Sequence, residues 1–275
     1  MNSATELPGN PFVSAYSLAR RLGILETSIG RRLFKSAYFF YKRYVEDDLE
    51  DLVQLFPNLV RGGNVLDIGA NIGYTATVLA RATDPGSKVY AFEPEPFNFG
   101  ILEQTAREPE FEGKIIPLQR AVGAEDGTIA LWVNDRHHGD HRIITEQFRS
   151  ENPREKEIAV TQLSVDSFLR GNQESVSFVK IDVQGYELAV LQGMRETLRQ
   201  NPNLTIVLEF MPPAMRDLGF EPSHLLDFFA EQEYKIFCVH PRGMLSEGVP
   251  SSLEDTSYCN LLFRRRPIER EGRAR

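Results

Sequence analysis

The pattern of hydrophobic and polar positions changes near residue 62. Before this point apolar residues recur at spacings of three and four, which is typical of amphipathic helices. Three helices are predicted there, over 12–22, 28–44 and 46–56. After Gly63 the pattern becomes one of short apolar runs that alternate with helical segments. The chain is therefore expected to divide into an N-terminal helical extension, residues 1–60, and a main domain, residues 61–275.

Short apolar runs predict the strands of the main domain. They lie at 64–68, 88–92, 114–119, 178–182, 204–210, 235–239 and 257–264. Helical patterns follow several of them, at 73–82, 96–107, 187–200 and 222–232. Such alternation predicts a doubly wound α/β fold, with a mostly parallel sheet and helices on both faces. Residues 128–133 and 158–163 alternate in the manner of strands with a polar stretch between them, and predict an inserted β-hairpin or a pair of edge strands.

Composition narrows the class of protein. The chain has 275 residues, of which 41% are hydrophobic and 10% aromatic, enough for a packed core. Its formal net charge of −8 argues against a general nucleic-acid binder, whose affinity comes from Lys and Arg at phosphates. The two cysteines, Cys238 and Cys259, have neither the spacing of a metal site nor the number of a disulfide framework.

The N-terminal residues and the longest apolar runs bear on location. The sequence MNSATELPGNPF has no basic segment followed by an apolar run, so no signal peptide is expected. No apolar run reaches the roughly 18 to 20 residues that a transmembrane segment needs. We therefore expect a cytoplasmic protein.

A basic and aromatic stretch, residues 31–44, stands out in the extension. A helix of this composition could lie on a membrane surface. It could equally pack its aromatic face on the main domain or on a second copy of the chain, as in a homodimer through the N-terminal helices. We favour packing, because packed helices are the more frequent source of such patterns.

The first motif with chemical content is Asp67-Ile68-Gly69-Ala70-Asn71-Ile72-Gly73. It joins the first strand to the first helix, at the edge of the sheet where open α/β proteins bind ligands. Its glycines allow a tight turn and a close approach to a ligand. Asp67 would repel a pyrophosphate but would suit the ammonium group of an amino-acid moiety, and the G-x-G-x-x-G pattern of dinucleotide sites is absent.

Two more motifs follow later strands. Glu93, in Phe92-Glu93-Pro94, ends the second strand, where a carboxylate can bind two ribose hydroxyls. Asp182, in Val179–Glu187, ends the fourth strand and is expected to face the same crevice. Gly185 permits a tight turn into the next helix, and Glu187 lies in the first turn of that helix, where a negative charge is favourable.

These residues resemble the FkbM-type methyltransferase family. The likeness is carried by Leu66–Gly73, Phe92-Glu93-Pro94, Ile181–Glu187 and Val190–Met194, in the order of the family, and it covers roughly residues 60–265. Where Gln184 stands, the family often has Glu. The resemblance implies a class I methyltransferase with a Rossmann-like fold, which uses S-adenosylmethionine for O-methylation of sugars, polyketides or other small molecules.

The same resemblance assigns the cofactor site by position. The first turn and the helix start would hold the methionine part of the cofactor, through Asp67, Gly69, Ala70, Asn71, Gly73, Tyr74 and Thr75. Glu93 and Pro94 would lie at the ribose and Ala121 and Val122 at the adenine, and Asp182 is also counted among the cofactor-binding residues.

The acceptor side is predicted from the chemistry of methyl transfer. Transfer to a hydroxyl is helped by a general base, and the candidates are Asp182, His141 and His138. The acceptor pocket is expected to come from residues 1–60 and 134–157, and the partner to be a small molecule. Asp182, Glu209 and Asp140 offer oxygen ligands for Mg²⁺, but no local spacing requires a metal and we expect none.

Four functions compete at this level. O-methylation of a small molecule is favoured, and N-methylation needs the same cofactor site and is hardly separated from it. A nucleotide-dependent oxidoreductase is disfavoured by Asp67 and by the missing dinucleotide pattern. A non-catalytic module is disfavoured because Asp67, Gly69, Glu93 and Asp182 are all in place.

Overall fold

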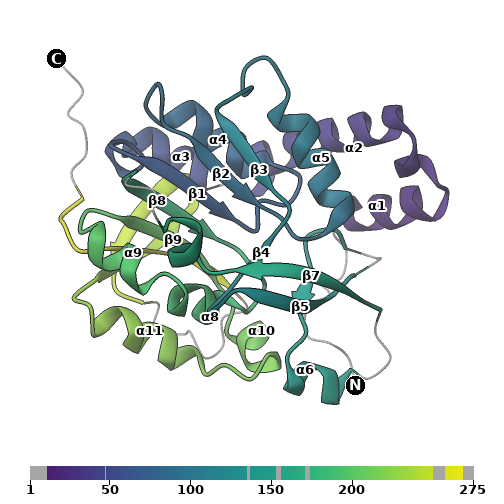
Figure 1. The fold of residues 1–275 in the computed structure, drawn as a ribbon. Coiled ribbons are helices and arrows are strands. Elements are labelled where there is room, and N and C mark those ends of the chain that lie inside the picture. Colours follow the sequence, from purple (N-terminus) through teal and green to yellow (C-terminus); the bar gives the residue numbers. More distant parts are fainter. Residues whose placement is uncertain are drawn as a thin grey trace.

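Eight strands form the central sheet in the computed structural model of the chain (Figure 1). The structure describes residues 11–46, 48–134, 137–152, 156–170, 174–249 and 258–268. The strands of the central sheet, in chain order, are β1 (Asn64–Ile68), β2 (Val89–Phe92), β3 (Ile115–Leu118), β8 (Val176–Ile181), β9 (Thr205–Phe210), β10 (Lys235–His240), β11 (Met244–Glu247) and β12 (Cys259–Arg264).

The strands lie in the order β11-β10-β12-β9-β8-β1-β2-β3. The five strands from β9 to β3 are parallel, and β12, β10 and β11 each pair antiparallel with their neighbours. The order reverses at β1, which has β2 on one side and β8 on the other, and such a reversal opens a crevice at the carboxyl ends of the strands. The predicted doubly wound, mostly parallel fold is confirmed.

Helices cover both faces of this sheet (Figure 1). One face packs against α3 (Leu49–Leu55), α4 (Tyr74–Ala82) and α5 (Pro96–Ala106); the other packs against α8 (Glu187–Gln192), α9 (Arg195–Gln200) and α11 (Pro222–Ala230). Successive residues of a strand point to opposite faces. Val65 of β1 accordingly belongs to the first hydrophobic cluster, and Leu66 and Ile68 belong to the second.

The predicted inserted hairpin is the antiparallel pair of β5 (Gly127–Trp132) and β7 (Glu157–Leu163). It is part of a larger unit, a second sheet in the order β4-β7-β5-β6, where β4 is Ala121–Val122 and β6 is Arg142–Ile143. The apolar pattern does not predict three short helices: α6 (Glu146–Glu151), α7 (Val165–Phe168) and α10 (Pro212–Asp217). Because β4 follows β3 directly, this second sheet borders the crevice.

The N-terminal extension begins with α1 (Pro11–Arg21) and α2 (Ser28–Tyr41), which continues as a π-helical turn over Lys42–Glu46. Phe34 and Tyr38 of α2 are buried in the same hydrophobic cluster as α4 and α5, so the inner aromatic face packs on the main domain as expected. The boundary near residue 60 stays a prediction. Within the described ranges, no helix has the length and apolar character that crossing a membrane requires.

The helix predicted over 187–200 is wrong in one respect, because the structure has two helices there. α8 ends at Gln192, and α9 begins at Arg195. The carboxylate of Asp166 accepts hydrogen bonds from the backbone N–H groups of Glu196 and Thr197, at 2.9 and 2.8 Å, and thereby caps the start of α9. This cap comes from a distant helix, so the local sequence pattern does not reveal the break.

Candidate active site

A cavity of about 860 Å³, partly open to solvent, lies at the carboxyl ends of β1, β2 and β8. This volume includes the solvent space at the mouth of the cavity. The following residues proposed from the sequence line it: Gly69, Ala70, Asn71, Tyr74, Thr75, Glu93, Pro94, Ala121, Val122, His138, His141 and Asp182. Segments far apart in the chain therefore meet at one place.

The turn after β1 fits closely against the end of β8. Gly69 has a φ of 83°, and a Cβ atom added there would lie 1.8 Å from the carbonyl oxygen of Asp182. The backbone N–H of Asp182 in turn donates to the carbonyl of Ile68 at 2.9 Å. Only glycine permits both this conformation and this approach. The turn and Asp182 are thus fixed relative to each other by the backbone.

Glu93 holds the same turn from β2. Its carboxylate accepts the backbone N–H of Asn71 and that of Glu95, each at 2.9 Å. Glu93 is almost fully buried, and burial raises the pKa of its carboxyl to about 8. A ligand that brings hydroxyl donors or a positive charge into the cavity would stabilise the ionised form of this carboxyl and lower its pKa.

Asp67 and Gly73 are not among the residues that line the cavity. Asp67 lies within β1, in register with Ala91 and Lys180, and one of its carboxylate oxygens, Oδ2, has no hydrogen-bond partner in the described part of the chain. Burial raises the pKa of Asp67 to about 7, against the lowering effect of Lys180. Because β1 extends through Ile68, Asp67 lies behind the cavity wall, and its role toward a cofactor stays a prediction.

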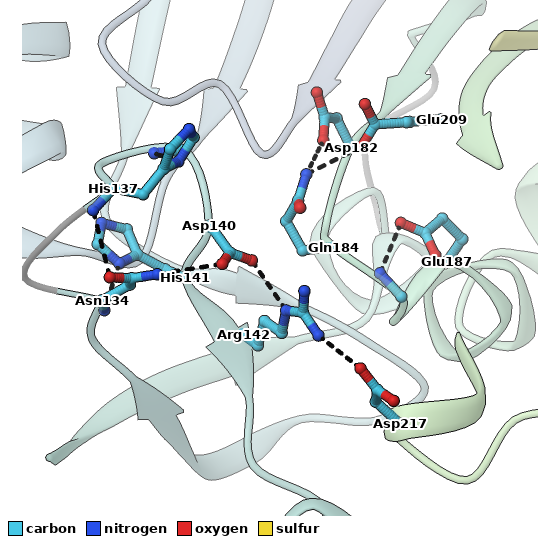
Figure 2. Close-up of polar contacts among 12 residues, drawn as sticks. Asn134, His137, Asp140, His141, Arg142, Asp182, Gln184, Glu187, Glu209 and Asp217 are labelled. Carbon is cyan, nitrogen blue, oxygen red and sulfur yellow. Dashed lines mark hydrogen bonds and ion pairs between the residues drawn. The ribbon is translucent and has the colours of Figure 1, made fainter. Parts of the chain in front are cut away.

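Asp182 belongs to a small carboxylate cluster (Figure 2). The side-chain amide of Gln184 donates to Asp182 and to Glu209, at 2.9 Å in each case. Burial works to raise the pKa of Asp182, but Lys180, Lys42 and the Gln184 amide together hold it below its usual value. Burial and the Asp182 charge raise the pKa of Glu209 well above its usual value. Asp182 is thus the ionised member of the pair and the one that lines the cavity.

Gln184 adopts a left-handed backbone conformation, with a φ of 55°. Such a conformation is uncommon for a residue with a side chain. Here it aims the amide at both carboxylates. A neutral amide donor suits this position, where a third carboxylate would face two others.

His138 is buried in a cage of aromatic rings from the extension. The rings of Tyr16, Phe34 and Tyr38 approach the imidazole edge-on, with centroids 5.0, 5.1 and 4.7 Å away. The backbone carbonyl of His138 accepts the side-chain amide of Asn98 at 2.7 Å. Burial is the main cause that lowers the pKa of His138 well below its usual value. The residue joins the hairpin loop, the extension and α5.

His141 lies in the same loop, and its Nδ1 accepts the backbone N–H of Asn134 at 3.1 Å (Figure 2). Burial, followed by the charge of Arg20, lowers its pKa to about 3. Its Nε2 has no hydrogen-bond partner in the described chain. Neutral imidazoles with such low pKa values are weak bases, so Asp182 is the strongest of the three candidates.

The sequence analysis assigns no site role to six polar residues of the lining: Tyr38, Lys42, Asn98, Arg120, Gln184 and Tyr186. Tyr38 and Lys42 belong to residues 1–60, from which the sequence predicts part of the acceptor pocket, but no sequence pattern singles out these two residues. They line the cavity from the end of α2 and the start of its π-helical turn. Asn98 sits in the first turn of α5, close behind Glu93 in the chain, and that proximity is the one signal that could have found it.

The described residues contain no group of three or more His, Cys, Asp or Glu side chains that could hold a metal ion. Asp140 is directed away from Asp182 and pairs with Arg142 at 2.9 Å, and Arg142 also pairs with Asp217 at 3.0 Å (Figure 2). The three oxygen donors considered from the sequence are therefore not assembled around one point.

Comparisons with known proteins agree with this arrangement of motifs. The family model of the methyltransferase FkbM domain matches residues 67–236, more than half of the chain. The hexuronic acid methyltransferase AglP of Haloferax volcanii is 31% identical over 162 residues, which are 58% of this chain and 61% of AglP. The methyltransferase sdnD of Sordaria araneosa is 25% identical over 205 residues, 66% of this chain and 77% of that protein.

Solved structures with a similar fold include a methyltransferase FkbM from Methylobacillus flagellatus, with a TM-score of 0.46, 14% identity, and coverage of 74% of this chain and 43% of that one. The O-methyltransferase TomG from Streptomyces achromogenes has a TM-score of 0.47 and 11% identity, and covers 95% of this chain and 92% of that one. The segment that matches the family model, residues 67–236, contains Asp67–Gly73, Glu93 and Asp182 of the three strand-end motifs. The chain belongs to the FkbM methyltransferase family.

Proposed function

We propose that this chain transfers a methyl group from S-adenosylmethionine to a hydroxyl group of a small molecule. The observation that carries the proposal is the cavity at the reversal of strand order, where the Gly69 turn, Glu93 and Asp182 meet. All three belong to the segment that matches the family.

The residues present fit the cofactor. Two lining residues, Asn98 and His141, hold buried polar atoms without a partner among the described residues, so the cavity has unused hydrogen-bonding capacity. The backbone of the Gly69 turn would hold the methionine part, Glu93 the ribose hydroxyls, and Ala121 with Val122 the adenine. When bound, S-adenosylmethionine supplies an electrophilic methyl group on a positively charged sulfur.

Asp182 is proposed as the group that handles the acceptor hydroxyl. As an ionised carboxylate in the lining, it can accept a hydrogen bond from that hydroxyl and orient its oxygen. It can then take the hydroxyl proton as the new oxygen–carbon bond forms. His138 and His141 are proposed to shape the pocket, since burial keeps both imidazoles neutral.

The class of acceptor follows from the chemistry of the lining and from the relatives. Polar residues, among them Lys42, Tyr38 and Arg120, take part in the lining, which suits a polyhydroxylated acceptor. The relative AglP is named for its action on a hexuronic acid. We therefore propose a sugar or a similarly hydroxylated small molecule.

The test is calorimetric titration of the full chain with S-adenosylmethionine and, separately, with NAD. We expect micromolar binding of the former, weakened in Glu93→Gln and retained in Glu95→Gln, whose buried carboxyl lies outside the cavity lining. Isotope-labelled methyl transfer to uronic acids and other hydroxylated acceptors follows. Binding of NAD alone would overturn the proposal, and methyl transfer to amines but not hydroxyls would overturn its oxygen specificity.

A further inference from the structure

Exposed apolar side chains gather on the N-terminal extension. Ten large hydrophobic residues are exposed in the described chain, and seven of them lie between residues 18 and 44. These seven are Leu18, Leu22, Ile24, Ile29, Leu33, Phe40 and Tyr44, and we call them the apolar ridge. Their exposed fractions run from 45% to 72%, so the part of the chain that the structure describes leaves the ridge uncovered.

The ridge is the outer face of a helix whose inner face is already used. Phe34 and Tyr38 of α2 are buried against the main domain. Ile29, Leu33 and Phe40 lie on the opposite face, at spacings of four and seven residues that keep them on one side of the helix. Figure 1 shows α1 and α2 side by side at one edge of the molecule, away from the central sheet.

The charge of this segment is opposite to that of the rest of the chain. Residues 11–44 contain seven Lys and Arg residues and one acidic residue, Glu26, which gives a formal net charge of +6. The whole chain has a net charge of −8, so the remainder carries −14. Arg21, Arg32 and Arg43 are exposed beside the ridge, and Arg43 also lies 3.8 Å from the carboxylate of Glu50, whereas Lys35 is paired inward with Glu108.

We propose that the apolar ridge and its three arginines form a docking surface for an anionic lipid membrane. Helices that lie in the plane of a membrane combine an apolar face with Lys and Arg that meet anionic headgroups. A second copy of the chain is the less suitable occupant, because a two-fold interface would bring two such positive faces together. The acidic remainder of the chain favours an orientation in which this edge alone faces the lipid.

Docking would place the cavity close to the lipid surface. Tyr38 and Lys42 line the cavity from the same helical segment that carries the ridge. An acceptor held at a membrane surface could therefore reach the cavity without leaving that surface. The docking itself does not depend on the proposed methyl transfer, and it is tested without activity.

The test is co-sedimentation of the full chain with vesicles of phosphatidylcholine alone and of phosphatidylcholine mixed with phosphatidylglycerol. We expect binding to the mixed vesicles only, weakened as the salt concentration rises. Reversing three charges in R21E/R32E/R43E should lower the partition coefficient on the order of 100-fold. The matched variant R61E/R107E/R149E makes the same change of net charge at exposed positions elsewhere and should lower it much less.

A second pair of variants tests how much the apolar side chains of the ridge contribute to membrane binding. Leu33→Ser with Phe40→Ser should lower the partition coefficient about tenfold or more. Leu55→Ser with Met244→Ser removes two exposed apolar side chains away from the ridge and should leave it unchanged. Thermal unfolding and binding of S-adenosylmethionine report whether each variant is folded.

Three results would overturn the proposal. If the wild-type protein sediments with neither kind of vesicle, or equally with both, an anionic membrane is not its partner. If the partition coefficient falls equally in the ridge variants and the control variants, the ridge is not the surface that binds the membrane. A dimer in light scattering that becomes a monomer in Leu33→Ser with Phe40→Ser assigns the ridge to a second copy of the chain.

Discussion

The two sides of the cavity come from different parts of the chain. One side consists of strand ends within residues 67–236, the segment that matches the family, and presents the Gly69 turn, Glu93 and Asp182. The opposite side comes from α2 and its π-helical turn, which lie before that segment, and presents Tyr38 and Lys42. We call these the strand-end side and the extension side.

The comparison teaches where function can vary. The strand-end side is fixed by backbone contacts, such as the hydrogen bonds from Gly69 and Ala70 N–H to the carbonyl of Phe92 at 3.0 and 2.9 Å. The extension side is held by side-chain packing around His138. A side built from backbone geometry suits a constant cofactor, whereas a side built from packed side chains can change its shape and charge with few substitutions. We therefore expect the extension side to determine the acceptor.

The largest effect is expected at Asp182 on the strand-end side. Asp182→Asn keeps the shape but removes the carboxylate that accepts the hydroxyl proton, so kcat should fall about 10²- to 10⁴-fold. Binding of S-adenosylmethionine, measured by calorimetry, should change far less. Glu209→Gln is the matched control, because Glu209 lies outside the lining and the amide oxygen of Gln can still accept the hydrogen bond from Gln184. Equal loss of kcat in both variants would contradict the assignment of Asp182.

The next largest effect is expected on the affinity for S-adenosylmethionine and its pH dependence, both through Glu93. Glu93→Gln should weaken binding of S-adenosylmethionine on the order of 100-fold, the loss expected for two hydrogen bonds to a charged group. The pKa of Glu93 is raised to about 8 by burial, and the ribose hydroxyls and sulfonium favour its ionised form. Binding should therefore release a proton, and the affinity of the wild type should rise with pH up to about 8 and then level off.

Calorimetry across this pH range checks the assignment of Glu93. The rise should be weaker in Glu93→Gln and persist in Glu95→Gln, which removes a neighbouring buried carboxyl outside the lining. Asp67, with a pKa raised to about 7, titrates in the same range. The variant Asp67→Asn shows how much of the pH dependence of the affinity comes from Asp67. An affinity that is independent of pH in the wild type would contradict a role of Glu93 at the ribose.

The two sides also differ in how far the sequence can predict them. Strand ends follow from local apolar runs, so the sequence alone places Glu93 and Asp182 correctly in the lining. It also predicts the bounds of β1, residues 64–68, but it does not reveal that Asp67, inside this strand, is absent from the lining. The break between α8 and α9 depends on a cap from Asp166, a contact that no local pattern contains.

The residues of the extension side that line the cavity also depend on tertiary contacts, so the local sequence pattern does not identify them. Residues 31–44 are evidently basic and aromatic, but their periodicity says only that one face is apolar. Which residues of α2 come near Asp182 depends on how this helix packs on the main domain. The contacts of Phe34 and Tyr38 with the ring of His138 contribute to that packing. The polar loop around His138 likewise has the composition of an exposed segment, whereas the structure buries its centre.

His138 connects the two sides and carries the third prediction. His138→Ala removes the ring from the cage of Tyr16, Phe34 and Tyr38, and should lower the free energy of unfolding by about 2 kcal/mol. This corresponds to a fall in Tm of about 2–4 °C for each kcal/mol. His224→Ala, at an exposed position on α11, is the control and should leave Tm unchanged. If both variants unfold like the wild type, the cage does not hold the extension in place.

The smallest expected effect is the most specific for the extension side. Lys42 lines the cavity, and its charge helps to lower the pKa of Asp182. Lys42→Met should therefore lower kcat/KM for the acceptor about tenfold while the Kd of S-adenosylmethionine stays within about twofold. Asp182 must be ionised to take a proton, so loss of the Lys42 charge should move the acidic limb of the kcat profile to higher pH.

A merely structural role of Lys42 would lower activity without moving that limb. Lys35→Met is the matched control, because Lys35 lies on the same helix but pairs with Glu108 outside the lining. If Lys42→Met weakens cofactor binding as much as acceptor turnover, then the extension side serves the cofactor as well. The division between a constant strand-end side and a variable extension side would then fail, because one residue before the family segment would be needed by both ligands.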